Sequence, residues 1–199
     1  MYALLQKMLK EIYLEEKPEG KEVQIRLEEA RARLYGMQQA IKERGLPVLV
    51  LFEGWGAAGK GSAIGKIIRN IDPRHFKVAT MASPTEDELR RPFLYRYFAQ
   101  LPEAGKFTFL DGGWIEQTAG EVLDGRLMGK GYSARIESIK RFERQLTDNG
   151  YLVLKFFFQI SEEEQTKRLE ALLADKDTAW RVSRQDRWQN RHYGKCRKV

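Results

Sequence analysis

Hydrophobic residues along the chain fall into two patterns, one typical of buried strands and one typical of amphipathic helices. Near-continuous apolar runs cover residues 48–52 and 151–160, and two further candidate strands cover 76–82 and 106–111, the last of which ends in an acid. Runs without polar alternation are typical of parallel strands that are covered on both faces. The run at 151–160 is the longest, and we predict it to be the central strand of a parallel sheet.

Helical periodicity occupies the segments before, between and after these strands. Apolar residues in 22–44 recur at spacings of three and four, which predicts one long helix. Its stripe consists of Val23, Leu27, Ala30, Leu34, Met37 and Ile41. This stripe could pack on the helix's own domain or form a dimer interface, so the pattern allows both a monomer and a homo-oligomer. Further helices are predicted over 1–16, 62–70, 85–98, 133–149, from 161 and from 183.

Start signals are present at two of these helices, and buried residues can be predicted for one of them. Capping-box patterns mark the starts at Thr85 and Ser161. The helix from Thr85 is expected to bury Phe93, Leu94, Tyr97 and Phe98. Strands that alternate with helices predict a three-layer α/β/α domain with a central parallel sheet at 46–199, after an N-terminal helical extension at 1–45.

Composition narrows the class of protein. The 199 residues are 42% hydrophobic and 11% aromatic, enough for one domain with a sizeable core. No apolar run approaches the length of a membrane span, and residues 1–10 lack the apolar centre of a signal peptide. A single cysteine, Cys196, excludes an internal disulfide and a cysteine-built metal site. We therefore expect a cytoplasmic protein without a membrane partner.

A glycine-rich segment follows the first strand. Gly54 and Gly59-Lys60 match the spacing of a P-loop, whose backbone N–H groups cradle phosphate while its lysine reaches the outer phosphates. Gly61 stands where a serine or threonine is usual. The alternative is a glycine-rich turn with an incidental lysine. The predicted phosphate- and nucleotide-binding residues are Gly54, Gly56, Ala57, Ala58, Gly59, Lys60, Gly61 and Ser62, with Lys60 also predicted to be catalytic.

An acidic residue, Asp111, ends the third predicted strand. In P-loop enzymes an acid at this place often holds Mg²⁺, directly or through water. Asp111 is therefore predicted to be a catalytic residue and a metal ligand, and the alternative is a cap for the following loop. Gly112 and Gly113 would keep the backbone open near phosphate.

Positive charge is concentrated at the C-terminal end. The net charge is +7, and residues 181–199 hold seven basic residues and one acidic residue. On the last predicted helix Arg184, Arg187, Arg191, Lys195 and Lys198 form one stripe. Either this stripe binds an anionic partner or it is a solvated helix face. Nucleic acid is not expected, because no aromatic ladder interleaves with the charges.

Several motifs in order resemble the polyphosphate kinase 2 family, and within it the polyphosphate:AMP phosphotransferases. The likeness covers roughly residues 46–195 and is carried by the segments 52–62, 72–76, 91–97 with Leu101-Pro102, 109–114, and 179–183 with Asp186. It implies a fold like that of thymidylate kinase, Mg²⁺, and phosphoryl transfer between inorganic polyphosphate and a nucleotide, from AMP to ADP. It also implies a helical lid at about 161–199 that binds polyphosphate through Arg181, Arg184, Arg187 and Arg191.

Two positions depart from the family's pattern. Gly56 stands where the family has aspartate, and Gly112 stands where it has arginine. Three alternatives follow. Activity is low, or another group such as Glu53 or Asp124 compensates for the lost carboxylate, or the chain is a non-catalytic domain that binds polyphosphate or nucleotide within a two-domain phosphotransferase. Family members also continue past the position of Val199. Gly56→Asp is expected to raise Mg²⁺-dependent transfer with no loss of stability beyond that of replacing a glycine.

Overall fold

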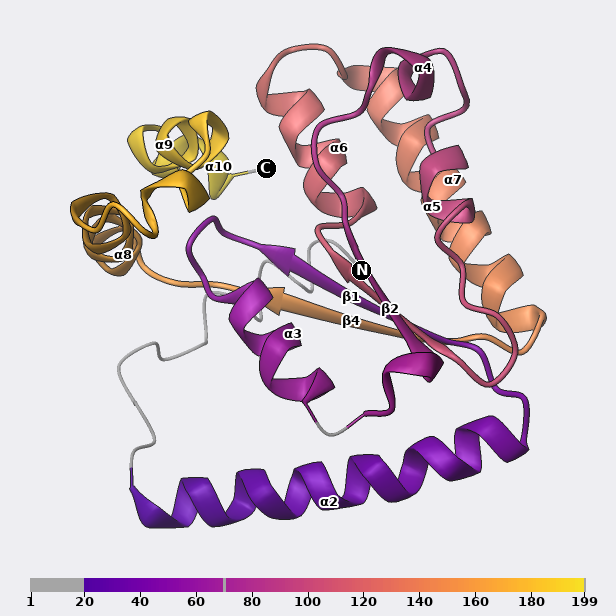
Figure 1. Cartoon of the computed structure of the whole chain (residues 1–199). Coiled ribbons are helices and arrows are strands. Elements are labelled where there is room, and N and C mark those ends of the chain that lie inside the picture. The colour runs from indigo at the N-terminus through magenta and orange to yellow at the C-terminus, as the bar shows by residue number, and fades with distance from the viewer. Residues whose placement is uncertain (1–19, 70, 199) are drawn as a thin grey trace.

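A four-stranded, all-parallel sheet lies at the centre of the molecule (Figure 1). The computed structural model describes residues 20–69 and 71–198, so the helix predicted over 1–16 lies outside the described residues. The strand order is β2-β3-β1-β4. The strands are β1 (Val48–Gly54), β2 (Phe76–Thr80), β3 (Phe107–Asp111) and β4 (Leu152–Phe158). Helices on both faces confirm the predicted three-layer α/β/α fold.

One face of the sheet is covered by α2 (Lys21–Glu43) and α3 (Lys60–Ile68) (Figure 1). Ile41 of α2 and Ile64 of α3 pack with the strand residues that point to this face, among them Val50. The C-terminal half of α2 therefore packs on its own domain, one of the two alternatives for its stripe. Met37 of that stripe is exposed.

The other face is covered by α6 (Trp114–Leu123) and α7 (Gly129–Asp148), with the short helices α4 (Glu86–Leu89) and α5 (Tyr95–Phe98) beside them. Fully buried Trp114 packs edge-on against Tyr97 and Phe142, with ring centroids 5.5 and 5.4 Å away. The indole N–H donates to Glu143 at 2.8 Å, so its polar atom is satisfied inside the core. A short 3-10 turn, η1 (Pro73–His75), leads into β2.

The helix predicted over 85–98 is wrong as a single element. The capping box between Thr85 and Glu88 is present, but α4 ends at Leu89. Pro92 has no N–H and cannot continue a helix, so α5 begins anew at Tyr95. Within α5, Tyr97 is buried as predicted while Phe98 is half exposed.

The longest apolar run forms an edge strand, which corrects its prediction as the central strand. Among the described strands, β4 pairs only with β1. Leu154 and Phe156 of β4 remain 38% and 48% exposed. An apolar run indicates that a strand can be buried. It does not indicate which strands lie beside it, and therefore does not indicate whether the strand is central or at an edge.

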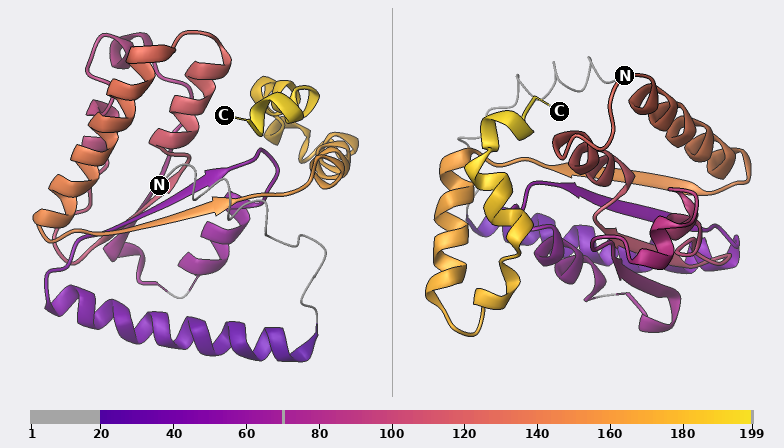
Figure 2. Two further views of the ribbon diagram at one scale, coloured as in Figure 1. Left: turned by 180° about the vertical axis from the view of Figure 1, so that it is seen from behind. Right: turned by 90° about the horizontal axis from the view of Figure 1, so that it is seen from above.

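A C-terminal group of helices lies at the carboxyl ends of β1 and β4 (Figure 2). These helices fall within the segment 161–199 that was predicted to form a lid, and we refer to them as the lid. It consists of α8 (Glu162–Ala174), the 3-10 turn η2 (Ala179–Arg181), α9 (Arg184–Arg191) and α10 (Tyr193–Cys196). The helix from Ser183 stops at Arg191, so Lys195 and Lys198 do not continue the predicted stripe on one helix. Across the described part of the chain, none of the helices is long and apolar enough to cross a bilayer.

Candidate phosphate-binding site

The glycine-rich loop between β1 and α3 has the backbone that its sequence requires. Gly54 has φ 126° and Gly59 has φ 100°, a region that residues with a Cβ rarely adopt. Ala57 also has positive φ, at 58°. A Cβ on Gly54 would overlap the carbonyl oxygen of Phe158 and lie 2.7 Å from its nitrogen. The glycine is therefore needed both for its φ and for the close approach of β4.

Backbone N–H groups of the loop fall into two sets. Gly54 N–H donates to Glu116 Oε2 at 3.2 Å, and Gly56 N–H donates to Gln189 Oε1 at 2.8 Å. Within residues 20–69 and 71–198, the N–H groups of Gly59, Lys60 and Gly61 have no hydrogen-bond acceptor. These three groups open the nine-residue helix α3, whose positive dipole end suits an anion.

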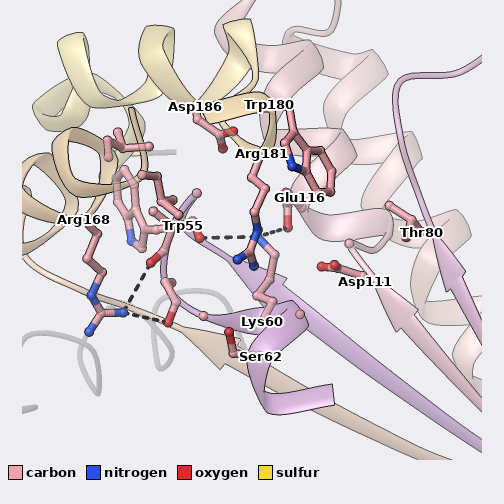
Figure 3. Close-up of a pocket in the computed structure, with 18 of the residues that line it drawn as sticks. Trp55, Lys60, Ser62, Thr80, Asp111, Glu116, Arg168, Trp180, Arg181 and Asp186 are labelled. Atoms are coloured by element: carbon pink, nitrogen blue, oxygen red, sulfur yellow. Dashed lines mark hydrogen bonds and ion pairs between the residues drawn. The ribbon is translucent and has the colours of Figure 1, made fainter. Parts of the chain in front are cut away.

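Lys60 folds back over the loop. Its Nζ donates to the carbonyl oxygens of Gly54 at 2.9 Å and Trp55 at 3.3 Å, and it lies 3.4 Å from Glu116 Oε2 (Figure 3). Burial raises the pKa of Glu116, and the nearby Lys60 partly offsets that rise. Glu116 was not predicted as a site residue, because nothing in its local sequence marks it as a partner of a lysine far away along the chain.

Asp111 lies at the carboxyl end of β3 and lines the same cavity as Lys60, as predicted. Burial raises the pKa of Asp111, with Lys60 opposing the rise, so a further cation beside it would stabilise the ionised form. The alternative was a cap for the next loop. Among the residues that the structure describes, no N–H group donates to the Asp111 carboxylate, whereas the start of α6 is held by Glu53.

Glu53 is buried in β1 and serves the helix α6. Its Oε1 accepts from the N–H groups of Ile115 at 2.8 Å and Glu116 at 3.0 Å, replacing the cap that Gly113 cannot supply. A Cβ on Gly113 would overlap the Glu53 carboxylate. Burial raises the pKa of Glu53 to about 7, although the two N–H groups oppose the rise.

Glu53→Gln is expected to remove a pH dependence of stability. The folded-state pKa lies above the ordinary 4.5, so the wild type loses stability as pH rises toward and through about 7. Because the glutamine side chain mimics the neutral acid, the variant should exceed the wild type by about 3 kcal/mol at pH 8 and by much less at pH 5. Urea unfolding of both proteins at the two pH values measures the difference. A difference that is the same at pH 5 and pH 8 would contradict this account.

The lid helices complete the cavity above the loop. This cavity, of about 860 Å³, is lined by the loop, by Asp111 and Glu116, and by Arg168, Trp180 and Arg181 of the lid (Figure 3). Arg168 Nη1 donates to the carbonyl oxygens of Ala57 at 3.3 Å and Ala58 at 3.2 Å. Arg168 therefore holds the loop from the side of the lid, and it was not predicted as a site residue.

The four arginines predicted to bind polyphosphate separate into two sets. Arg181 reaches the loop cavity, while Arg184, Arg187 and Arg191 line a cavity of about 450 Å³ together with Asp124 and Trp188. A cavity of about 560 Å³ between them shares residues with both. The three cavities therefore adjoin, and the arginines follow a path away from the loop.

Gly56 and the two residues proposed to substitute for its missing carboxylate each have close neighbours in the structure. A Cβ on Gly56 would overlap Asp186 Oδ1, so the expectation that Gly56→Asp brings no added loss of stability is wrong. Asp124, one proposed substitute, pairs with Arg126 at 2.7 Å and does not line the loop cavity. Glu53, the other proposed substitute, accepts a hydrogen bond from the Ile115 N–H at the start of α6.

A glycine loop and a carboxylate at the carboxyl edge of a parallel sheet, beneath helices that bring arginines, define a P-loop kinase domain. A profile of the polyphosphate kinase 2 family matches residues 17–199, and the chain belongs to that family.

Named relatives agree with this assignment. The chain is 33% identical over 161 residues to the polyphosphate:AMP phosphotransferase of Pseudomonas syringae, covering 81% of the chain and 32% of the relative. It is 34% identical to ADP-polyphosphate phosphotransferase 3 of Rhizobium meliloti, covering 81% and 56%. The chain therefore spans 32% and 56% of the lengths of these two relatives. The crystal structure of polyphosphate kinase 2 from Arthrobacter aurescens superposes with a TM-score of 0.87 at 26% identity, over 96% of this chain and 70% of that one.

Proposed function

We propose that the chain transfers a phosphoryl group between inorganic polyphosphate and a nucleotide, with AMP as acceptor and ADP as product. One observation carries the proposal: Lys60, Asp111 and Arg181 line a single cavity onto which the start of α3 opens. Three separate elements thus bring two cations and a carboxylate to one cavity. The names of the relatives, which include AMP and ADP phosphotransferases, support the same chemistry.

Positioning and charge stabilisation suffice for this reaction. The attacking group is a phosphate oxygen of the nucleotide, which is already ionised, so no general base is required. Lys60 and the N–H groups of α3 would hold the transferring phosphoryl group, and Arg181 would approach it from the lid. Holding the two substrates in line is the main contribution of such a site.

Magnesium fits the residues present. No cluster of three or more His, Cys, Asp or Glu side chains suited to a metal ion occurs in the described parts of the chain. Mg²⁺ in phosphoryl-transfer sites, however, uses one or two carboxylates and takes its other ligands from phosphate and water. Asp111 would hold it, and when bound it would neutralise charge on the phosphoryl oxygens.

The direct test is to incubate the protein with AMP, polyphosphate and Mg²⁺ and to measure ADP. Parallel reactions with ADP or GDP in place of AMP establish the acceptor. ADP formation that needs all three components supports the proposal. No transfer to any of the three nucleotides, by a protein that is folded, would overturn it. A cytoplasmic location and a homo-oligomeric state stay predictions.

A second candidate, a non-catalytic domain that binds polyphosphate, is favoured by Gly112. This residue has φ 91°, and a Cβ there would lie 3.4 Å from the carbonyl oxygen of Met81. The backbone is thus unsuited to the arginine that the resemblance implies at this position. Polyphosphate binding without any transfer would favour this candidate.

Polyphosphate binding is expected to depend on salt through the arginines of α9. The logarithm of the binding constant falls as the logarithm of the salt concentration rises. Replacing Arg184, Arg187 and Arg191 together by Gln should make this slope less steep by about 2 to 3, by the counterion-release argument made for nucleic acids. Binding titrations at several salt concentrations measure the slope. A matched control replaces three exposed cations on α7, namely Lys140, Arg141 and Arg144. Equal slopes for wild type and the α9 variant would make the α9 arginines a solvated face.

A further inference from the structure

The backbone N–H and carbonyl oxygen of Gly56 both form hydrogen bonds with the lid. Gln189 of α9 accepts its N–H at 2.8 Å, and buried Gln165 of α8 donates to its carbonyl oxygen at 3.1 Å. The two glutamines also bond to each other at 3.0 Å. Trp55, the preceding residue, stacks on Tyr193 of α10 with ring centroids 4.1 Å apart. The lid is therefore docked on the loop in one register, centred on Gly56.

Asp186 occupies the space that a side chain at position 56 would fill. A Cβ on Gly56 would overlap Asp186 Oδ1, and it would lie 3.0 Å from Asp186 Cγ. The φ of Gly56 is not positive, so a larger residue is excluded there by Asp186 and not by backbone strain. A glycine at position 56 is what allows this carboxylate to reach the loop.

The Asp186 carboxylate is oriented by its own helix. Oδ2 accepts from the Ser183 N–H at 2.8 Å and from the Ser183 hydroxyl at 2.6 Å, completing the capping box of α9. Oδ1 accepts no hydrogen bond from the residues that the structure describes, and it faces Gly56. Asp186 lines the same cavity as Lys60 and Asp111. One oxygen is therefore anchored while the other is available to a ligand.

We infer that Asp186 is the second carboxylate of the phosphate site, brought from the lid opposite Asp111 of the sheet to hold a Mg²⁺–polyphosphate complex. The inference rests on the proposed function. Two carboxylates with phosphate and water is a ligand set that Mg²⁺ commonly takes. Because one carboxylate belongs to α9, the site is complete only with the lid docked, so metal-dependent binding of polyphosphate is coupled to docking of the lid.

Calorimetric titration with tripolyphosphate, with and without Mg²⁺, tests the inference without relying on catalysis. Asp186→Asn keeps the shape and one hydrogen-bond acceptor for Ser183. It should reduce the gain in affinity that Mg²⁺ gives by about tenfold or more, since even outer-shell partners of a metal contribute about 10- to 100-fold. Without Mg²⁺ the variant should bind tripolyphosphate as tightly as wild type or more tightly, because a negative charge beside phosphate has been removed.

The control is Asp177→Asn, which removes a negative charge from an exposed part of the lid outside the cavity and should leave both affinities unchanged. A second variant, Gly56→Asp with Asp186→Ala, moves the carboxylate from the lid to the loop. It should recover most of the Mg²⁺-dependent gain, while Gly56→Asp alone should undock the lid and expose it to protease.

The outcomes separate this inference from the proposed function. If wild type binds tripolyphosphate with a gain from Mg²⁺ and Asp186→Asn keeps the whole gain, Asp186 is only a helix cap and the inference is overturned. If wild type does not bind tripolyphosphate under either condition, the proposed function and the inference fall together.

Discussion

Lys60→Ala is expected to lower the rate of phosphoryl transfer by about 10²- to 10³-fold, the loss typical of removing one donor from the charge-stabilising part of an active site. The Lys60 ammonium lies 2.9 Å from the Gly54 carbonyl oxygen and 3.4 Å from Glu116, and it has three donors to share with phosphate. Initial rates of ADP formation from AMP and polyphosphate measure the loss.

The chain offers a matched control on the same helix. Lys66→Ala removes the same charge from the exposed last turn of α3 and should change the rate little. Alanine is a good helix former, so both variants should remain folded, as circular dichroism can check. A Lys60→Ala enzyme with an undiminished rate would show that the loop does not hold the transferred phosphoryl group.

Features encoded by neighbouring residues could be predicted from the sequence. The strand, glycine loop and helix around Lys60 depend on spacing within about twenty residues, and the capping box at Thr85 and the helix start at Ser161 depend on four. Asp111 was found for the same reason, since the end of an apolar run marks the end of its strand.

Features made by distant residues could not be predicted. Helix α6 lacks a capping side chain at Gly113, because its start is held by Glu53 of β1. Its sequence therefore carries no start signal. Arg168 and Gln189 bond to the loop from more than a hundred residues away, so only the fold shows that they belong to the site.

Glycines that stand where the family has larger side chains are a second case in which distant residues decide the structure. Taken from the sequence alone, Gly56 and Gly112 are losses of functional side chains. In the structure Gly56 lies against Asp186, and Gly113 lies against Glu53, so each of these two glycines leaves room for a carboxylate from another element. The meaning of a glycine at such a position depends on the side chain that approaches it, which a single sequence does not reveal.

Gly54→Ala is expected to remove the phosphate site together with part of the stability of the fold. The new Cβ would overlap the Phe158 carbonyl oxygen, which accepts the Trp55 N–H at 3.0 Å where β1 and β4 end. Both colliding groups are backbone, so relief requires the strand ends to separate. With the additional strain of φ 126°, we expect a loss of about 3 kcal/mol in the free energy of unfolding.

A second glycine of the same segment provides the control with the opposite sign. Gly65 lies inside α3, and a Cβ there would meet no atom within 4 Å. Gly65→Ala should therefore stabilise the protein by about 1 kcal/mol and leave tripolyphosphate binding unchanged. Urea unfolding and tripolyphosphate titration of the two variants give the comparison. If Gly54→Ala were as stable as wild type and still bound tripolyphosphate, the loop would not need the close contact between Gly54 and Phe158 that shapes it here.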